Sequence, residues 1–133
     1  MLKSALFVLT ILFSQLVASA ECIDANGEDI YSRPEIFSVL IENSETCYEA
    51  KQLAEACAYG SSLDAMTAGL AYGVCESELQ AQDPSQELVK LLTKMEGLCA
   101  DKYEQMDGTM YISMNAFCYL SSIEWILNIA TPN

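Results

Sequence analysis

The sequence has no histidine and few basic residues. Lys and Arg total 6 against 19 Asp and Glu, which gives a formal charge of −13. Without histidine there is no Ser-His or Cys-His dyad for nucleophilic catalysis, and no imidazole to bind a metal. The negative balance argues against nucleic acid or an anionic membrane surface as a partner. It permits a basic partner, and it also serves simply to keep a protein soluble.

Three further patterns are missing, and each removes a class of protein. No two of the six cysteines have a CxxC spacing, which argues against a zinc site. There is no glycine-rich phosphate loop, and the carboxylates form no distinctive pair of the glycosidase kind. No stretch alternates with a period of two for long enough to make a strand. We therefore predict an all-α protein that is not an enzyme and needs no cofactor.

The first twenty residues have the pattern of a signal peptide. Lys3 gives a basic start, an apolar run follows, and small residues precede a cleavage site after Ala20. A lipoprotein signal would need a small residue just before Cys22, where the sequence has glutamate. We predict that residues 1–20 are removed and that 21–133 form one domain, periplasmic or secreted, without membrane insertion. The alternative is an uncleaved anchor. Because Lys3 is the only charge removed, the mature formal charge is −14.

Helix-start and helix-stop signals predict a small bundle of five helices: two helical hairpins after a short N-terminal helix. Ser32, Thr46 and Asp83 are the expected N-caps of the first, second and fourth helices. The predicted spans are about 33–42, 47–58, 62–79, 84 to before Gly108, and 109–130.

The expected core is built around the fifth helix. It is apolar on most sides, so we predict that it is central and that Trp125 lies in the core. Ser113 and Asn115 interrupt its apolar run, and we expect them to satisfy backbone or helix-end groups. In the third helix Ala65, Gly69 and Gly73 form a small-residue line, which predicts close approach by a neighbouring helix.

The segment between Asp24 and Asp29 faintly resembles a calcium loop. Its glycine and distal glutamate are not where an EF-hand needs them, so we interpret the segment as an acidic turn.

Six cysteines after a signal peptide predict three disulfides, and fifteen connectivities are formally open. In an antiparallel hairpin, residues equidistant from the turn face each other, because each residue advances about 1.5 Å along its helix. A turn near Gly60 then favours Cys47–Cys75 and disfavours Cys57–Cys75. A turn at Gly108 favours Cys99–Cys118. The remaining pair, Cys22–Cys57, would tie the N-terminal segment to the end of the first hairpin.

The second hairpin has the better candidate for a contact site. Tyrosines, which are common in protein interfaces, flank its turn. The predicted partner-binding tip comprises Tyr103, Glu104, Asp107, Gly108, Thr109 and Tyr111.

The same stretch carries the pattern C-x3-Y-x4-G-T-M-x3-M-x3-C-x-L-x2-I, from Cys99 to Ile123. This resembles the C-terminal half of the LprI-type family of small exported bacterial proteins, whose members include inhibitors of lysozyme. Residues 91–98 lack the Gln, Trp and Arg that the family usually has there. The resemblance implies a helical, disulfide-bonded fold and a lysozyme-like target.

We therefore predict an exported, non-catalytic protein-binding module, lysozyme-inhibitor-like, that acts on a basic protein. Two alternatives stay open: a structural or accessory envelope or secreted protein, and a carrier with an apolar pocket between its helices.

Overall fold

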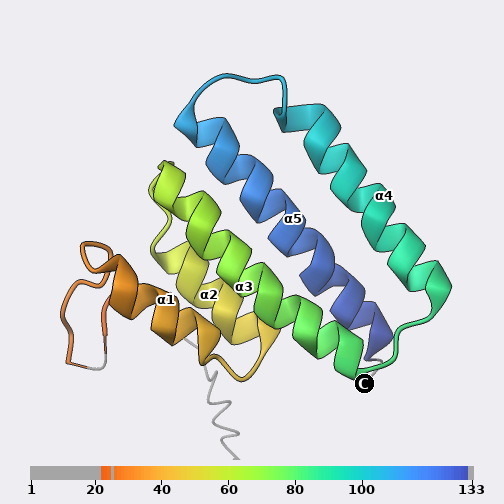
Figure 1. The fold of residues 1–133 in the computed structure, drawn as a ribbon, viewed down its shortest axis with the longest axis horizontal. Helices are drawn as coiled ribbons and strands as arrows, with labels where there is room; N and C mark the ends of the chain where they lie inside the picture. Colours follow the sequence, from red (N-terminus) through yellow and green to blue (C-terminus); the bar gives the residue numbers. More distant parts are fainter. Residues whose placement is uncertain (1–21, 25, 132–133) are drawn as a thin grey trace, which may run out of the picture.

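The computed structural model describes residues 22–24 and 26–131, so the predicted signal peptide lies outside the described residues. Five helices make up most of this part of the chain (Figure 1). They are α1 (Pro34–Glu42), α2 (Cys47–Ala56), α3 (Ser62–Ala81), α4 (Gln86–Tyr103) and α5 (Thr109–Ala130). The described residues contain no strand, only an isolated bridge between Ile23 and Asp29. The all-α prediction is confirmed.

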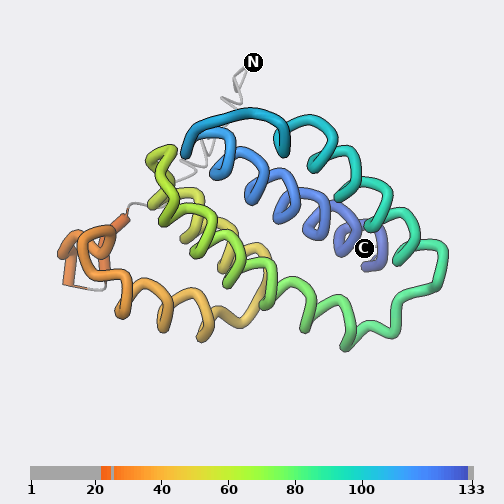
Figure 2. The backbone as a smooth tube through the Cα atoms, turned by 45° about the horizontal axis from the view of Figure 1, so that its top comes forward, coloured from red at the N-terminus to blue at the C-terminus, as the bar shows by residue number. Residues whose placement is uncertain are grey.

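The helices are arranged around α3 and α5, which lie side by side (Figures 1 and 2). The α3 helix also packs against α1 and α2, whereas α5 has α4 on its other side. The backbone of α4 comes close to that of α5 and of no other described helix. As predicted, the inner face of α5 lies at the centre of the bundle. The α3 helix is equally central.

The hydrophobic core lies between α1, α2, α3 and the inner face of α5. Its fully buried side chains include Phe37, Ile41, Ala54, Ala71, Leu120, Ile123 and Ile126. The α4 helix contributes only Leu92 and Cys99 to the buried set. This helix is therefore attached to the side of the core, not enclosed by it.

Three disulfides join the elements: the two pairs that the hairpin geometry predicts, and the pair of cysteines that remained. Cys47–Cys75 bridges α2 and α3, with 4.3 Å between the Cα atoms. Cys99–Cys118 bridges α4 and α5, with 5.8 Å between the Cα atoms. Cys22–Cys57 ties the N-terminal segment to the end of α2.

Two of the three expected N-caps are wrong. Pro34 takes the first helical position of α1, so the cap is Arg33 and not Ser32, and no side chain caps this helix. The α4 helix is capped by Ser85, whose hydroxyl accepts from the Leu88 N–H. Asp83 instead adopts a positive φ of 50° in the preceding turn. The Thr46 cap is confirmed, since its hydroxyl accepts from Glu49 N–H at 3.2 Å.

Two predictions about buried surface are also wrong. Trp125 is 48% exposed, because no element covers the outer face of α5. Gly69 and Gly73 are exposed, and a Cβ atom built on either would meet nothing within 4 Å. No helix approaches them, because α4 packs against α5 and leaves this face of α3 open.

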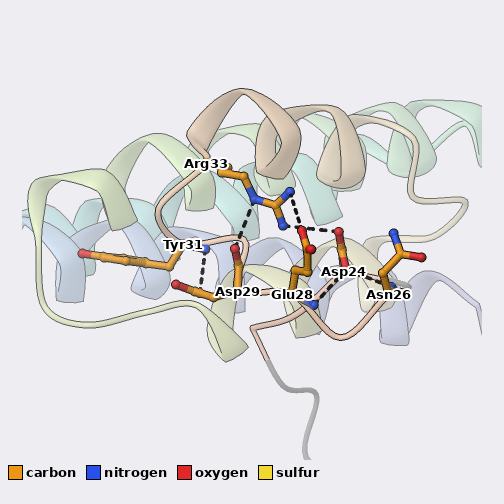
Figure 3. A network of polar contacts seen from close by, with 6 residues as sticks. All are labelled: Asp24, Asn26, Glu28, Asp29, Tyr31 and Arg33. Atoms are coloured by element: carbon orange, nitrogen blue, oxygen red, sulfur yellow. Dashed lines mark hydrogen bonds and ion pairs between the residues drawn. The ribbon is translucent and has the colours of Figure 1, made fainter.

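The acidic turn at the N-terminus is organised around Arg33 (Figure 3). The guanidinium lies 3.3 Å from a carboxylate oxygen of Asp24 and 3.3 Å from one of Glu28. Asp24 also accepts from the N–H groups of Glu28 and Asn26, and these bonds, with the nearby Arg33, lower its pKa. These carboxylates are thus engaged with a guanidinium and the backbone, as an acidic turn requires. In the described segments no group of three or more His, Cys, Asp or Glu converges as a metal site.

Candidate functional site

The turn between α4 and α5 contains the residues of the predicted partner-binding tip. The α4 helix ends at Tyr103, and the N–H of Glu104 bonds to the Ala100 carbonyl at 2.9 Å. Gly108 then caps α5 with a φ of 116°, a region that side-chain-bearing residues rarely adopt. Its carbonyl accepts from the N–H groups of Tyr111 and Ile112. The turn is therefore defined by backbone bonds and a required glycine.

The predicted tip residues lie on this turn with different degrees of exposure. Glu104, Asp107, Gly108 and Thr109 are exposed, and Tyr111 is exposed on the first turn of α5. Tyr103 is half-buried, and the Lys102 ammonium lies over its ring, 4.8 Å from the centroid.

Two connections hold the tip in place. Cys99–Cys118 joins the two helices of the hairpin close to their connecting turn. On α5, the Ser113 hydroxyl donates to a carboxylate oxygen of Asp64 at 2.7 Å. Ser113 thus meets a helix-end group, as predicted. Asn115 departs from the prediction, because its Oδ1 atom is buried without a hydrogen-bond partner in the described part of the chain.

Asp64 is the buried carboxylate that joins the two hairpins. It is 1% exposed and accepts from the N–H groups of Tyr59, Gly60 and Ser61, the Gly60 bond being 2.7 Å long. Burial alone would raise its pKa, but the hydrogen bonds from Ser113 and these three N–H groups outweigh burial and lower the pKa. Sequence reasoning placed Asp64 at a helix start and missed its bond to α5.

Sequence reasoning also missed that Met114 and Trp125, two large apolar side chains of α5, face solvent. Met110 and Met114 lie one turn apart on the same face of the helix, and Met110 is 61% exposed. Trp125 lies further along this face, and we name these three residues the α5 outer stripe. Exposed apolar side chains gathered on one face are typical of an interaction surface. Met106 and Ile112, which lie next to tip residues in the chain, are exposed as well.

Charge is distributed unevenly around this surface. Within the described segments every ion pair involves Arg33 or Lys51. The tip carboxylates Glu104 and Asp107 therefore have no cationic partner among the described residues. At the opposite end of the bundle, where α1 and α3 end and α2 and α4 begin, lies a further acidic group: Glu42, Glu45, Glu49, Glu76, Glu78, Asp83 and Glu87. We call this group the acidic end.

None of the helices α1–α5 combines the length and apolarity that crossing a bilayer requires. Comparison with protein-family models, with curated proteins and with solved structures found no match. The resemblance to the LprI-type family therefore rests on the cysteine and Gly-Thr-Met pattern of residues 99–123.

Proposed function

We propose that the protein is an exported, non-catalytic binding module that docks on a basic protein through the tip and the α5 outer stripe. The observation that carries the proposal is the exposure of Met110, Met114 and Trp125 on a helix whose other face is in the core. The resemblance of residues 99–123 suggests a lysozyme as the class of partner.

The chemistry of this surface suits a protein partner. Met is flexible and polarisable, so it adapts to uneven apolar surfaces, and Trp often contributes a large share of the binding energy. Met110 begins the stripe just after Glu104 and Asp107 in the chain, and these exposed carboxylates form no ion pair within the described residues. A formal charge of −13 would further accelerate encounter with a basic protein.

The location of the protein is part of the same proposal. Three disulfides persist in an oxidising environment, which supports the periplasm or the exterior as the place of action. Basic lysozymes act in those compartments, so the proposed partner and the proposed location agree.

The test is calorimetric titration of basic lysozymes with the wild-type protein and with Met110→Gln/Met114→Gln. We expect wild-type binding that weakens as salt is raised, and a loss of at least about tenfold in the double variant. Met66→Gln is the matched control, because Met66 on α3 is 44% exposed and Met114 is 41% exposed. The control should bind like wild type.

Two results would contradict the proposal. One is the absence of binding and inhibition across several basic lysozymes and other basic extracellular proteins. The other is binding that the double variant and the Met66 control reduce equally, which would place the contact elsewhere.

A further inference from the structure

A groove of about 370 Å³ lies over α5, between α3 and α4. Its floor and walls are mostly small: Ala65, Ala68 and Gly69 from α3, with Ala116 from α5. It exists because the backbone of α4 stays away from that of α3. The volume falls in the range of natural small-molecule sites, about 300–1,000 Å³.

Polar character in the groove is confined to one side. Tyr72 and Tyr119 add aromatic rings to the lining, and Glu96 of α4 adds the only charged group. The Tyr72 hydroxyl donates to a carboxylate oxygen of Glu96, so this pair bridges α3 and α4. Burial, and then this bond, raise the pKa of Tyr72, so the hydroxyl stays protonated and continues to orient the carboxylate.

Glu96 lacks a cation of its own. It is half-buried, forms no ion pair with any described residue, and has no basic neighbour in the groove lining. A carboxylate in apolar surroundings attracts a cation more strongly than one in water, and tyrosine rings favour the same charge. The alanines and Gly69 offer an apolar surface directly beside it.

We propose that this groove binds a small amphipathic amine, with its protonated nitrogen at Glu96 and its apolar body along the alanines and tyrosine rings. The site shares no residue with the tip or the α5 outer stripe. It is therefore independent of the proposed binding of a basic protein.

The first experiment uses octylamine as the probe and octanol as its uncharged counterpart. Carbon-13 labelling of alanine methyl groups reports the site directly by NMR. Octylamine should shift the Ala65, Ala68 and Ala116 signals and leave Ala50 and Ala54, buried in α2, unchanged. Octanol should bind about tenfold more weakly, because it lacks the charge-assisted contact.

Two sets of variants test the roles assigned to the residues. Glu96→Gln should weaken octylamine binding about tenfold and leave octanol binding unchanged. Gly69→Leu should fill the groove and abolish binding of both probes. Gly73→Leu is its matched control, since both glycines are exposed on α3 with room for a side chain, and it should bind like wild type.

The proposal is overturned if the Ala65, Ala68 and Ala116 methyl signals do not respond to octylamine. Equal affinity of the wild-type protein for octylamine and octanol would remove the role of Glu96. Undiminished binding to Gly69→Leu would show that the probe binds elsewhere.

Discussion

Each of the two helical hairpins is joined by one disulfide, but the two hairpins differ in how much of their surface is buried. Cys47–Cys75 joins α2 and α3 inside the core, where α1 and α5 cover the pair. Cys99–Cys118 joins α4 to α5, but the backbone of α4 comes close to no other described helix, and Met110, Met114 and Trp125 on the outer face of α5 are exposed. The first hairpin is part of the core, whereas the second contributes mainly the inner face of α5 to the core and leaves its other side exposed.

The use of basic residues follows the same division. Arg33 and Lys51, which lie before and within the first hairpin, form all the ion pairs of the described segments. The lysines of α4, Lys90, Lys94 and Lys102, form none. The N-terminal cations thus hold elements together, whereas the lysines of the second hairpin are exposed.

The largest expected effect comes from removing each staple in turn. Cys47→Ala/Cys75→Ala should lower the free energy of unfolding by about 4 kcal/mol and reduce amide protection throughout the core. Cys99→Ala/Cys118→Ala should cost about 3 kcal/mol, with lost protection concentrated in α4. Denaturant unfolding and amide hydrogen exchange measure these two quantities. A uniform loss of protection in the second variant would contradict the division between the hairpins.

Asp64 should be the most important polar side chain, because it joins the hairpins. Asp64→Asn should destabilise the fold by about 3 kcal/mol, since a neutral amide cannot accept from all its N–H and hydroxyl partners. Asp107→Asn at the exposed tip is the matched control and should change stability by less than about 0.5 kcal/mol.

The pH dependence follows from the lowered pKa of Asp64. Its contribution to stability is fully present above the ordinary carboxyl pKa and is lost as the pH falls through the lower folded-state pKa. Unfolding curves at decreasing pH should therefore converge for wild type and Asp64→Asn. A constant difference between the two proteins down to strongly acidic pH would show that the charge of Asp64 is not what stabilises the fold.

Lys51 provides a smaller link between α2 and α5. Its ammonium lies 2.9 Å from Glu124 and 3.0 Å from Glu55, and although burial lowers its pKa, these two bonds raise it overall. Glu124→Gln should cost about 1 kcal/mol and Glu55→Gln, on the more exposed carboxylate, about 0.3 kcal/mol. The contribution of the pair should persist below the unfolded lysine pKa and disappear as the pH rises through the raised value. Equal costs at neutral pH would show that the bond across the helices adds nothing to the one within α2.

Trp125 should give the smallest effect on stability. Trp125→Ala should change the free energy of unfolding by less than about 1 kcal/mol, whereas Ile126→Ala at the fully buried next position should cost about 3 kcal/mol. Because this tryptophan is the only one in the chain, its fluorescence should be quenched readily by acrylamide, an uncharged quencher that the acidic protein does not repel, in the native state. Strong protection from acrylamide would place the indole in the core instead.

Local signals and simple geometry predicted much of this fold. Capping residues and glycines locate the five helices, and the axial rise of a helix is enough to pair Cys47 with Cys75 and Cys99 with Cys118. Caps moved by one or two residues at Arg33 and Ser85, because Pro34 and Pro84 constrain the chain around them.

The sequence could not predict which helices pack against each other. A helix that is apolar on most sides has no periodic signal to show which face is covered, so Trp125 was assigned to the core. The Asp64–Ser113 bond spans 49 residues and depends on α3 lying beside α5. The tip residues were identified because a required glycine and flanking tyrosines are local features, but the exposure of Met114 one turn further along α5 was not predicted.

The most direct test is amide hydrogen exchange of the protein alone and with an excess of a basic lysozyme to which it binds. We predict new protection in residues 104–114 and along α5 towards Trp125, with the acidic end unchanged. Protection confined to the acidic end, or spread evenly over the helices, would contradict the assignment of the second hairpin as the binding surface.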